Sequence, residues 1–525
     1  MEEKKSGGNK KIIYLTLGLI IALGLFLRVW NIDSAPPGIY PDEAVNGEDA
    51  LRAAQENDWQ WFYTANNGRE GLYINFIAIF FKLFGVSFLT LKLTSIIFGT
   101  LTIWGTYLLT KELFKKESMA LISAFLISVS FWAINFSRIG FRAIMLPAVL
   151  VFAFYFLWRG IRSKKFTNFA IGGFIFGIGL HTYIAFRIAP LILVFTLLAL
   201  LWQQKSFFKN YWKQILIFAL FVLISASPML WTFLAHPEFL DSRSADVSIL
   251  SPELNQGHLI KTFFRSFGLS LAKYNFWGDQ NWRHNYPPYP VLNPIVGLAF
   301  LGGLFYFIWR FFSELGEKLF LKRSLKTFVI STFLLSWFFL MLAPEFMTAE
   351  GLPHALRSLG VMPVVYIFAA LAFMFFLEKA RSHTYIIQKI ILMTTIASLV
   401  FIGVFNGIKY HVFWKNKKET AQSFEKNLIK ISNYIKTVSP YKEIFVITGS
   451  MQRIPIKLLN HEALYIYYLY PDEIQNIEPK NPTYFEVILT EKNEEIIQKL
   501  QEKFSDLEFK EVTDSQDITF YILKK

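Results

Sequence analysis

The chain has no cysteine among its 525 residues, and only 18% of the residues are charged. The missing cysteines exclude disulfides, a thiolate metal site and a cysteine nucleophile. The small charged fraction accompanies 54% hydrophobic residues and a mean hydropathy of +0.37. This composition lies outside the range of soluble globular proteins and indicates a chain that crosses a membrane many times.

Apolar runs of roughly 20 residues predict about eleven membrane-spanning helices. They lie at 12–30, 88–110, 118–136, 144–161, 168–181, 187–203, 213–233, 291–312, 327–343, 361–377 and 389–408. The apolar stretch 72–84 is predicted to lie in the membrane interface, because counting it as a span would move every later loop to the opposite side. The expected fold class is mostly α: a polytopic transmembrane helical bundle with amphipathic juxtamembrane helices in the first external loop.

Positive charge is concentrated in alternate short loops. The net charge is +14, and lysines and arginines cluster at 111–116, 159–165, 205–213, 318–326 and 379–381. The positive-inside rule places these loops and the amino terminus in the cytoplasm. No small-residue cleavage site follows the basic amino terminus, so we expect a retained helix rather than a signal peptide. The expected localisation is a multi-pass protein of the plasma or inner membrane, and the charge pattern gives no reason to expect a nucleic-acid partner.

Two domains are expected from this pattern. Residues 1–408 form a transmembrane module, and residues 409–525, which are richer in charge, form a small extracytoplasmic α/β domain. Within this domain a strand is expected at 442–449, a helix at 493–504 and a closing strand at 518–523. The domain could help to bind an acceptor or could simply cover the membrane module.

The most informative segment is Gly38-Ile-Tyr-Pro-Asp42-Glu43-Ala-Val-Asn-Gly47, which follows the first apolar run. Carboxylates next to a membrane are costly and usually serve chemistry or ion binding. The alternative is that Asp42 and Glu43 cap a helix that begins near Ala44, since aspartate is a good N-cap residue.

Other polar side chains collect in the loops predicted to be external. They are Arg69, Glu70, Arg138, Arg142, His181, Tyr183, Arg187, Asp279, Arg283, His284, Glu350, His354 and Arg357. Arginines that converge at one membrane face suit an anionic lipid-linked substrate, because guanidinium groups bind phosphate through paired donors. A carboxylate beside them can take a proton from an attacking hydroxyl.

Each of these residues also has a structural interpretation. The arginines could be interfacial anchors, the tyrosines part of an aromatic belt, and His181 a helix-end histidine. His284 and His354 could bind a metal ion with Glu345 or Glu350, but the spacing matches no closed zinc site, so a divalent metal remains the less favoured alternative.

Three segments resemble the polytopic glycosyltransferases of the C-type (GT-C) fold, especially the branch with protein O-mannosyltransferases and the bacterial aminoarabinose transferase. The first is Pro-Pro-Gly-Ile-Tyr-Pro-Asp42-Glu43 together with Gly71-Leu-Tyr-Ile-Asn and the residues up to Gly85. The second is Phe136-Ser-Arg138, and the third is Pro353-His354-Ala-Leu-Arg357-Ser358. The resemblance covers roughly residues 10 to 380 and implies a GT-C-like bundle.

The resemblance implies an enzyme that moves a hexose or pentose from a polyprenyl-phosphate carrier to an acceptor hydroxyl at the extracytoplasmic face. Asp42 would be the general base, Glu43 would orient it or bind the acceptor, and Arg138 and Arg357 would neutralise the carrier phosphate. The acceptor could be a protein, a glycolipid or a glycan. The other polar residues of the external loops are candidate substrate-binding residues.

One departure from the family concerns metal binding. Relatives often carry a carboxylate shortly after the Ser-Arg pair, where some place a metal, but the run Ser137-Arg-Ile-Gly-Phe-Arg142 has none. This difference argues against a metal cofactor and assigns charge neutralisation to Arg142. The sequence also has no Asp-x-Asp signature for a nucleotide sugar, which agrees with a lipid-linked donor.

The alternative function is that of a transporter or lipid flippase. That class predicts charges near the middle of the bilayer and two related halves. The charges of this chain lie at the ends of the predicted spans, and the sequence has no duplicated halves.

Overall fold

The computed structural model describes residues 2–240, 248–321 and 327–524. It contains two compact units. The first comprises residues up to Trp30, Trp61–Tyr73 and Thr94–Lys409, and the second comprises Asn31–Gln60, Ile74–Leu93 and the residues from Tyr410 onward. Residues 322–326 of one predicted cytoplasmic loop, which include Lys322, Arg323 and Lys326, lie outside the described residues.

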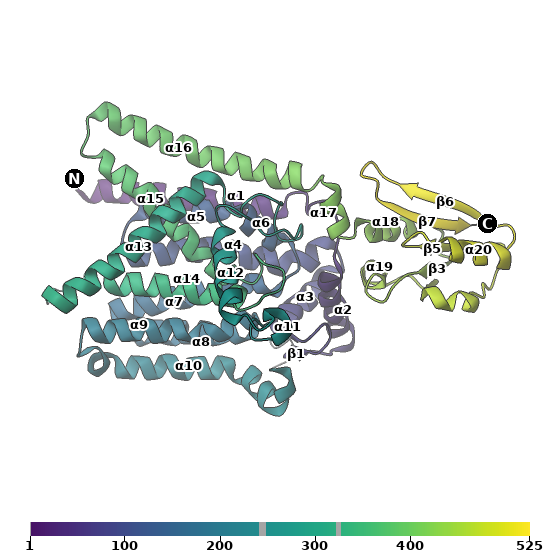
Figure 1. Cartoon of the computed structure of the whole chain (residues 1–525), viewed down its shortest axis with the longest axis horizontal. Coiled ribbons are helices and arrows are strands. Elements are labelled where there is room, and N and C mark those ends of the chain that lie inside the picture. Colours follow the sequence, from purple (N-terminus) through teal and green to yellow (C-terminus); the bar gives the residue numbers. More distant parts are fainter. Residues whose placement is uncertain (1, 241–247, 322–326, 525) are drawn as a thin grey trace. The chain divides into compact units, whose positions relative to one another are not determined.

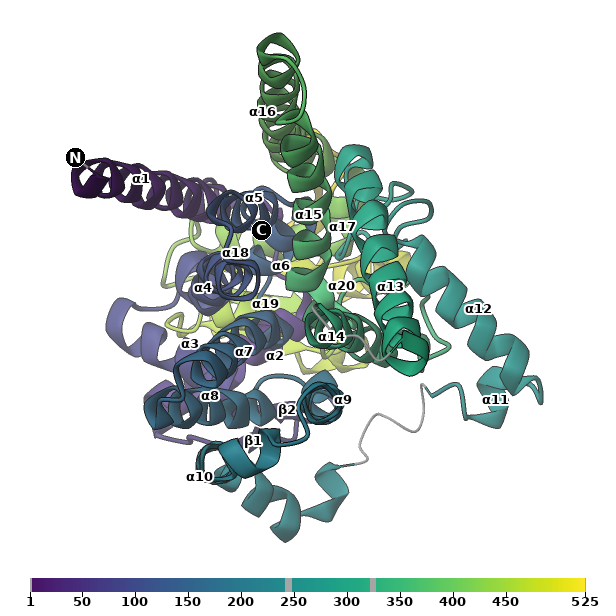
Figure 2. The same cartoon turned by 90° about the vertical axis from the view of Figure 1, so that its left-hand side faces the viewer.

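The first unit is a helical bundle. Its helices are α1 (Glu2–Val29), α4 (Phe88–Phe114, whose first turns belong to the second unit), α5 (Glu117–Ser128), α6 (Phe131–Arg138), α7 (Met145–Ser163), α8 (Phe166–Ile178), α9 (Pro190–Gln203), α10 (Phe207–Ala235), α11 (Pro252–Asn255), α12 (Leu259–Ala272), α13 (Pro294–Leu321), α14 (Phe328–Phe346), α15 (Met362–Ala380) and α16 (Tyr385–Ile408). Figure 1 shows α7, α8, α9, α10 and α14 running side by side. Figure 2 looks along the helices and shows α11 and α12 at the edge of the bundle.

Within the described residues, nine helices are long and apolar enough to cross a membrane, and a tenth span is formed if α5 and α6 are counted together. This pair is bent by 55°, at the position of the span predicted at 118–136. The span predicted at 168–181 corresponds to the helical segment Phe166–His181, which is apolar but shorter than the others. The sequence therefore predicted the polytopic bundle correctly, and the expected number of spans was slightly high.

Small residues allow a close contact between two helices of the bundle. A Cβ atom on Gly173 of α8 would lie 2.2 Å from the backbone oxygen of Phe218 in α10, and one on Gly177 would lie 2.4 Å from that of Val222. Because lipid gives little hydrophobic driving force between helices, such backbone proximity provides much of the packing.

The second unit combines α2 (Pro41–Glu56) and α3 (Gly71–Phe84, most of it) with the carboxyl-terminal part of the chain. The apolar helix α3 coincides with the stretch predicted to lie in the interface. The unit's other elements are η6 (Lys409–Trp414, a π-helix), α17 (Lys418–Ser423), α18 (Lys426–Ile435), β3 (Glu443–Ile447), α19 (Arg453–Leu459), β4 (Ile466–Leu469), η7 (Pro471–Asn476), β5 (Phe485–Leu489), α20 (Glu494–Lys503), β6 (Glu508–Thr513) and β7 (Thr519–Lys524).

The carboxyl-terminal strands form one mixed sheet in the order β4-β3-β5-β7-β6. β3 pairs in parallel with β4 and β5, whereas β7 runs antiparallel to β5 and β6. Val446 and Ile488 pack against α18 and α19 on one face, and Val487 and Leu489 pack with α20 on the other. The predicted α/β domain is thus observed, with a strand, a helix and a last strand close to their expected positions.

The grouping by packing differs from the linear division expected from the sequence. The change of unit at Lys409 lies next to the predicted boundary, but the second unit also takes in Asn31–Gln60 and Ile74–Leu93. The functional division into residues 1–408 and 409–525 stays a prediction.

Candidate functional site

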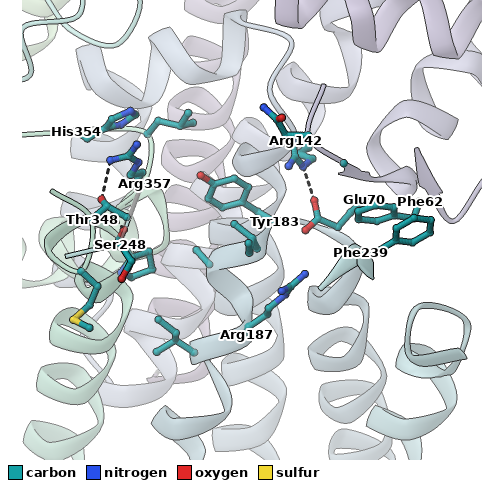
Figure 3. A pocket seen from close by; sticks show the side chains of 18 residues that line it. Phe62, Glu70, Arg142, Tyr183, Arg187, Phe239, Ser248, Thr348, His354 and Arg357 are labelled. Carbon is teal, nitrogen blue, oxygen red and sulfur yellow. Dashed lines mark hydrogen bonds and ion pairs between the residues drawn. The ribbon is translucent and has the colours of Figure 1, made fainter. Parts of the chain in front are cut away.

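The first unit contains a cavity of about 430 Å³ that is lined by polar residues from five separate segments. Figure 3 shows Glu70, Arg142, Tyr183, Arg187, His354 and Arg357 around it. The complete lining is Phe62, Asn67, Gly68, Glu70, Arg142, Tyr183, Ile184, Ala185, Arg187, Ile188, Phe239, Ser248, Pro344, Met347, Thr348, His354, Leu356 and Arg357. All of these residues belong to one compact unit, and six of them were predicted as site residues from the sequence.

A small hairpin presents Glu70. Its strands are β1 (Phe62–Tyr63) and β2 (Arg69–Glu70), which pair antiparallel with Phe62 opposite Glu70. The turn between them places Asn66, Asn67 and Gly68 at positive φ, and asparagine and glycine tolerate this conformation best. The turn residues thereby bring Glu70 to the cavity.

Arg142 is held on two sides. Its Nε donates to Oε2 of Glu70 in an ion pair, and its guanidinium lies over the ring of Tyr183, 5.6 Å from the ring centroid. Arg142 begins the short helix η1 (Arg142–Ile144), directly after α6. The Glu70 carboxylate fixes the guanidinium plane, and part of the guanidinium edge remains for a ligand.

The other two cavity arginines are oriented by neutral oxygens. Arg357 donates through Nη1 to the Thr348 hydroxyl and to the Glu350 carbonyl, at 2.7 Å in each case. Arg187 donates to the Leu240 carbonyl at 2.9 Å. Among the described lining residues there are thus three arginines and one glutamate. This balance makes the cavity positive and suits an anionic group such as a phosphate.

A cluster of possible metal ligands includes one cavity residue. Ligand atoms of Asp279, His284 and His354 all lie within 4.8 Å of one another. Nδ1 of His284 lies 3.0 Å from Oδ2 of Asp279, which also accepts from the Ala355 amide at 2.7 Å. Two imidazoles and a carboxylate are the donor set of many divalent metal sites. The sequence had grouped the two histidines with Glu345 or Glu350, and the structure supplies Asp279 in their place.

Glu345 has a different task, because it forms a buried ion pair with Lys273. Its second oxygen accepts from the His354 amide at 2.9 Å, and Lys273 also donates to the Ser358 hydroxyl at 2.5 Å. Burial lowers the pKa of Lys273, although the Glu345 carboxylate acts in the opposite direction. This arrangement fixes both ends of the loop that carries His354 and Arg357. Lys273 was missed because a single lysine after an amphipathic helix gives no sequence signal.

The remaining predicted residues of this unit lie outside the cavity lining. Arg138 is buried beside Arg28 and donates to the Leu27 carbonyl at 3.0 Å. Arg69 is buried and donates to the Ala65 carbonyl at 3.1 Å, whereas His181 is buried with Nε2 2.9 Å from the Ser225 carbonyl. Arg283 contacts Asn281 through its side chain, and Glu350 is exposed.

Asp42 and Glu43 belong to the second unit, in the first turn of α2. The helix begins at Pro41, three residues before the expected start near Ala44, and its N-cap residue is Tyr40, so neither acid is the N-cap. Asp42 is half-buried, whereas Glu43 is fully buried with its carboxylate 3.8 Å from the Lys92 ammonium. The two neighbouring acids therefore have different surroundings, which the sequence could not distinguish.

Comparison with known proteins finds a family model that matches part of the chain and solved structures that share its fold. Residues 72–231 match the sequence family described as "Dolichyl-phosphate-mannose-protein mannosyltransferase". No curated protein sequence matches the chain. The structure is similar to ArnT from Cupriavidus metallidurans in its apo state, with a TM-score of 0.57 and 10% identity. It is also similar to the same protein bound to undecaprenyl phosphate, with a TM-score of 0.53 and 12% identity, and both comparisons cover 98% of each chain.

The matched segment begins after the acid pair, so the family match does not include Asp42 and Glu43. At such low identity the structural likeness concerns the fold, which is shared over nearly the whole length. The sequence match and the fold together confirm the resemblance to the GT-C glycosyltransferases, with the membrane bundle and the enzyme class that it implied. The chain is a multi-pass membrane glycosyltransferase.

We expect the protein to bind about one divalent metal ion at Asp279, His284 and His354, because their donor atoms can converge on a single ion. Elemental mass spectrometry of the purified protein tests this expectation. His354→Ala should lose the metal, while His383→Ala, at an exposed histidine, should retain it. Equal metal content in the two variants would contradict the assignment.

Lys273→Ala should lower the free energy of unfolding by about 3–5 kcal/mol, because it leaves the Glu345 carboxylate buried without its cation. Thermal unfolding in detergent, followed by tryptophan fluorescence, measures the effect. Lys261→Ala is the matched control, since this lysine is exposed on the neighbouring helix α12. A similar small change in both variants would show that the ion pair contributes little.

Proposed function

We propose that this glycosyltransferase transfers a sugar from a polyprenyl-phosphate carrier to an acceptor hydroxyl at the extracytoplasmic membrane face. The observation that carries the proposal is the positive cavity of the first unit, with Arg142 and Arg357 on its wall. A phosphodiester-linked sugar presents one negative charge beside a neutral ring, which three arginines and one glutamate suit. The related ArnT structure with undecaprenyl phosphate supports this choice of donor.

In the proposed reaction, the acceptor oxygen attacks the anomeric carbon while Asp42 takes the hydroxyl proton. The bond between the anomeric carbon and the phosphate oxygen breaks, and its electron pair leaves with the polyprenyl phosphate. Negative charge grows on that phosphate in the transition state, where fixed guanidinium groups stabilise it most. A single displacement of this kind inverts the anomeric centre.

The surroundings of the acid pair support Asp42 as the base rather than Glu43. Glu43 is fully buried with its carboxylate 3.8 Å from the Lys92 ammonium, which suits a structural role. Asp42 is half-buried at the amino end of α2, where an acceptor can approach it. Among the arginines, Arg142 and Arg357 are the preferred phosphate ligands, because Arg138 is not part of the cavity lining.

Asp42→Asn should lower kcat by at least about 100-fold, the usual contribution of a general base, with the fold retained. Lipid-linked sugar extracted from cells that lack the protein serves as donor, and mass spectrometry follows its consumption. Glu56→Gln is the control, because this glutamate is exposed at the other end of α2. Unchanged transfer by Asp42→Asn would rule out the proposed base, and it would favour the transporter alternative if lipid movement persisted as well.

Arg357→Ala should weaken undecaprenyl phosphate binding roughly 10- to 100-fold, because it removes hydrogen bonds to a charged group worth about 1.5–3 kcal/mol. Arg357→Lys should fall between this variant and the native protein, since an ammonium keeps the charge but loses the paired donors. Titration of the lipid with tryptophan fluorescence gives the dissociation constants. Arg265→Ala, at an exposed arginine of α12, is the control, and equal affinity in all variants would remove Arg357 from the donor site.

A further inference from the structure

The segment that carries the acid pair, residues 38–47, contacts the carboxyl-terminal domain at both of its ends. All of the residues involved belong to the second compact unit. The segment lies near the amino end of the chain, and the residues it contacts lie between Phe424 and Leu458.

The first contact is between backbones. A Cβ atom on Gly38 would lie 2.0 Å from the backbone oxygen of Phe424, so no other residue fits without moving the main chain. Tyr40 packs the edge of its ring against Phe424, with ring centroids 6.3 Å apart. Phe424 is completely buried and also packs against Trp414, at 5.7 Å. The residues that precede α2 thus pack against an aromatic cluster of the carboxyl-terminal domain.

The second contact is between helices. A Cβ atom on Gly47 of α2 would lie 2.5 Å from Cδ2 of Leu458 in α19. One residue along each helix, the Lys457 ammonium lies 3.2 Å from the Glu48 carboxylate. On its other side, α19 places Ile456 in the hydrophobic core under β3. A displacement of α19 would therefore move α2, because the helix is packed between α2 and the sheet.

Asp42 lies between these two contacts. It is in the first turn of α2, four residues after Gly38 and five before Gly47. A carboxylate in a regular helical turn, fixed on both sides, has little freedom to change position. A shift of about 1 Å at a reacting group can cost about 100-fold in rate, so the contacts matter for catalysis as well as for folding.

We propose that the carboxyl-terminal domain is a positioning element of the transferase, which fixes Asp42 through Phe424 at one end of the segment and Leu458 at the other. The proposal rests on the proposed role of Asp42. It differs from a merely protective role of the domain, which predicts that mutations at these contacts change stability but not the turnover of protein that has folded.

The Gly47–Leu458 contact allows a test by rescue. Gly47→Ala should lower kcat roughly tenfold, because the added methyl group must displace Leu458 by a few tenths of an ångström or more. Leu458→Ala removes the nearest obstructing atom and leaves only Cδ1 of Leu91, 3.0 Å from the added methyl group, so the double variant should recover most of the lost kcat. Gly268→Ala is the matched control, since nothing lies within 4 Å of the Cβ position of this helical glycine.

Gly38→Ala is the stronger perturbation and should lower kcat by about 100-fold. Undecaprenyl phosphate binding should stay unchanged in all of these variants, because the arginine cavity belongs to the other unit. Each variant is therefore assayed for kcat, for the KM of the extracted lipid-linked sugar, for undecaprenyl phosphate affinity and for the unfolding midpoint.

Loss of kcat at constant lipid affinity, with recovery in the double variant, supports the positioning role. Full activity of Gly47→Ala, or a loss of stability and lipid affinity without rescue, would overturn it while leaving the proposed function in place. If Asp42→Asn keeps its activity, the proposed function itself fails. If Gly38→Ala does not fold, the rescue experiment decides alone, because its substitutions meet only side-chain atoms.

Discussion

Charge that is removed from water must be neutralised or solvated by the protein, and the candidate site depends on this constraint. Three buried charges lie next to an opposite charge: Lys273 next to Glu345, Glu70 next to Arg142, and Glu43 next to Lys92. Arg28 is solvated by the Gly24 and Ser128 carbonyls and by the Ser137 hydroxyl. These contacts fix the loops in an apolar environment, so that Arg357 and His354 are presented to the cavity in defined positions.

The sequence predicted the fold where its signals were local. Long apolar runs predicted the spans, the stretch 72–84 predicted α3, and the short apolar run within 442–449 predicted β3. The bend between α5 and α6 was not predicted, because hydropathy averaged over a window does not detect a break of a few residues. The position of α2 with the carboxyl-terminal domain was also inaccessible, since it depends on contacts between distant parts of the chain.

The sequence predicted only part of the site, because residue type is a local signal whereas the contacts of each side chain depend on the fold. Residue type alone predicted Arg142, Arg187 and Arg357 as site residues, and all three line the cavity. It could not separate them from Arg138, whose guanidinium is engaged by the Leu27 carbonyl of α1. Nor could it select Asp279 as the acid beside His284, because that choice follows from the fold of the loop between α12 and α13.

The close contact between Gly38 and the backbone of Phe424 has a consequence for the synthesis of the enzyme. During synthesis the acid-bearing helix leaves the ribosome early, but the residues that complete its packing are translated near the end. A chain interrupted before that stage can insert its spans into the bilayer but lacks the residues that pack against the segment with Asp42. If Asp42 is the base and is positioned by this domain, as proposed, such incomplete molecules would consume no carrier lipid until the last part of the chain has been translated.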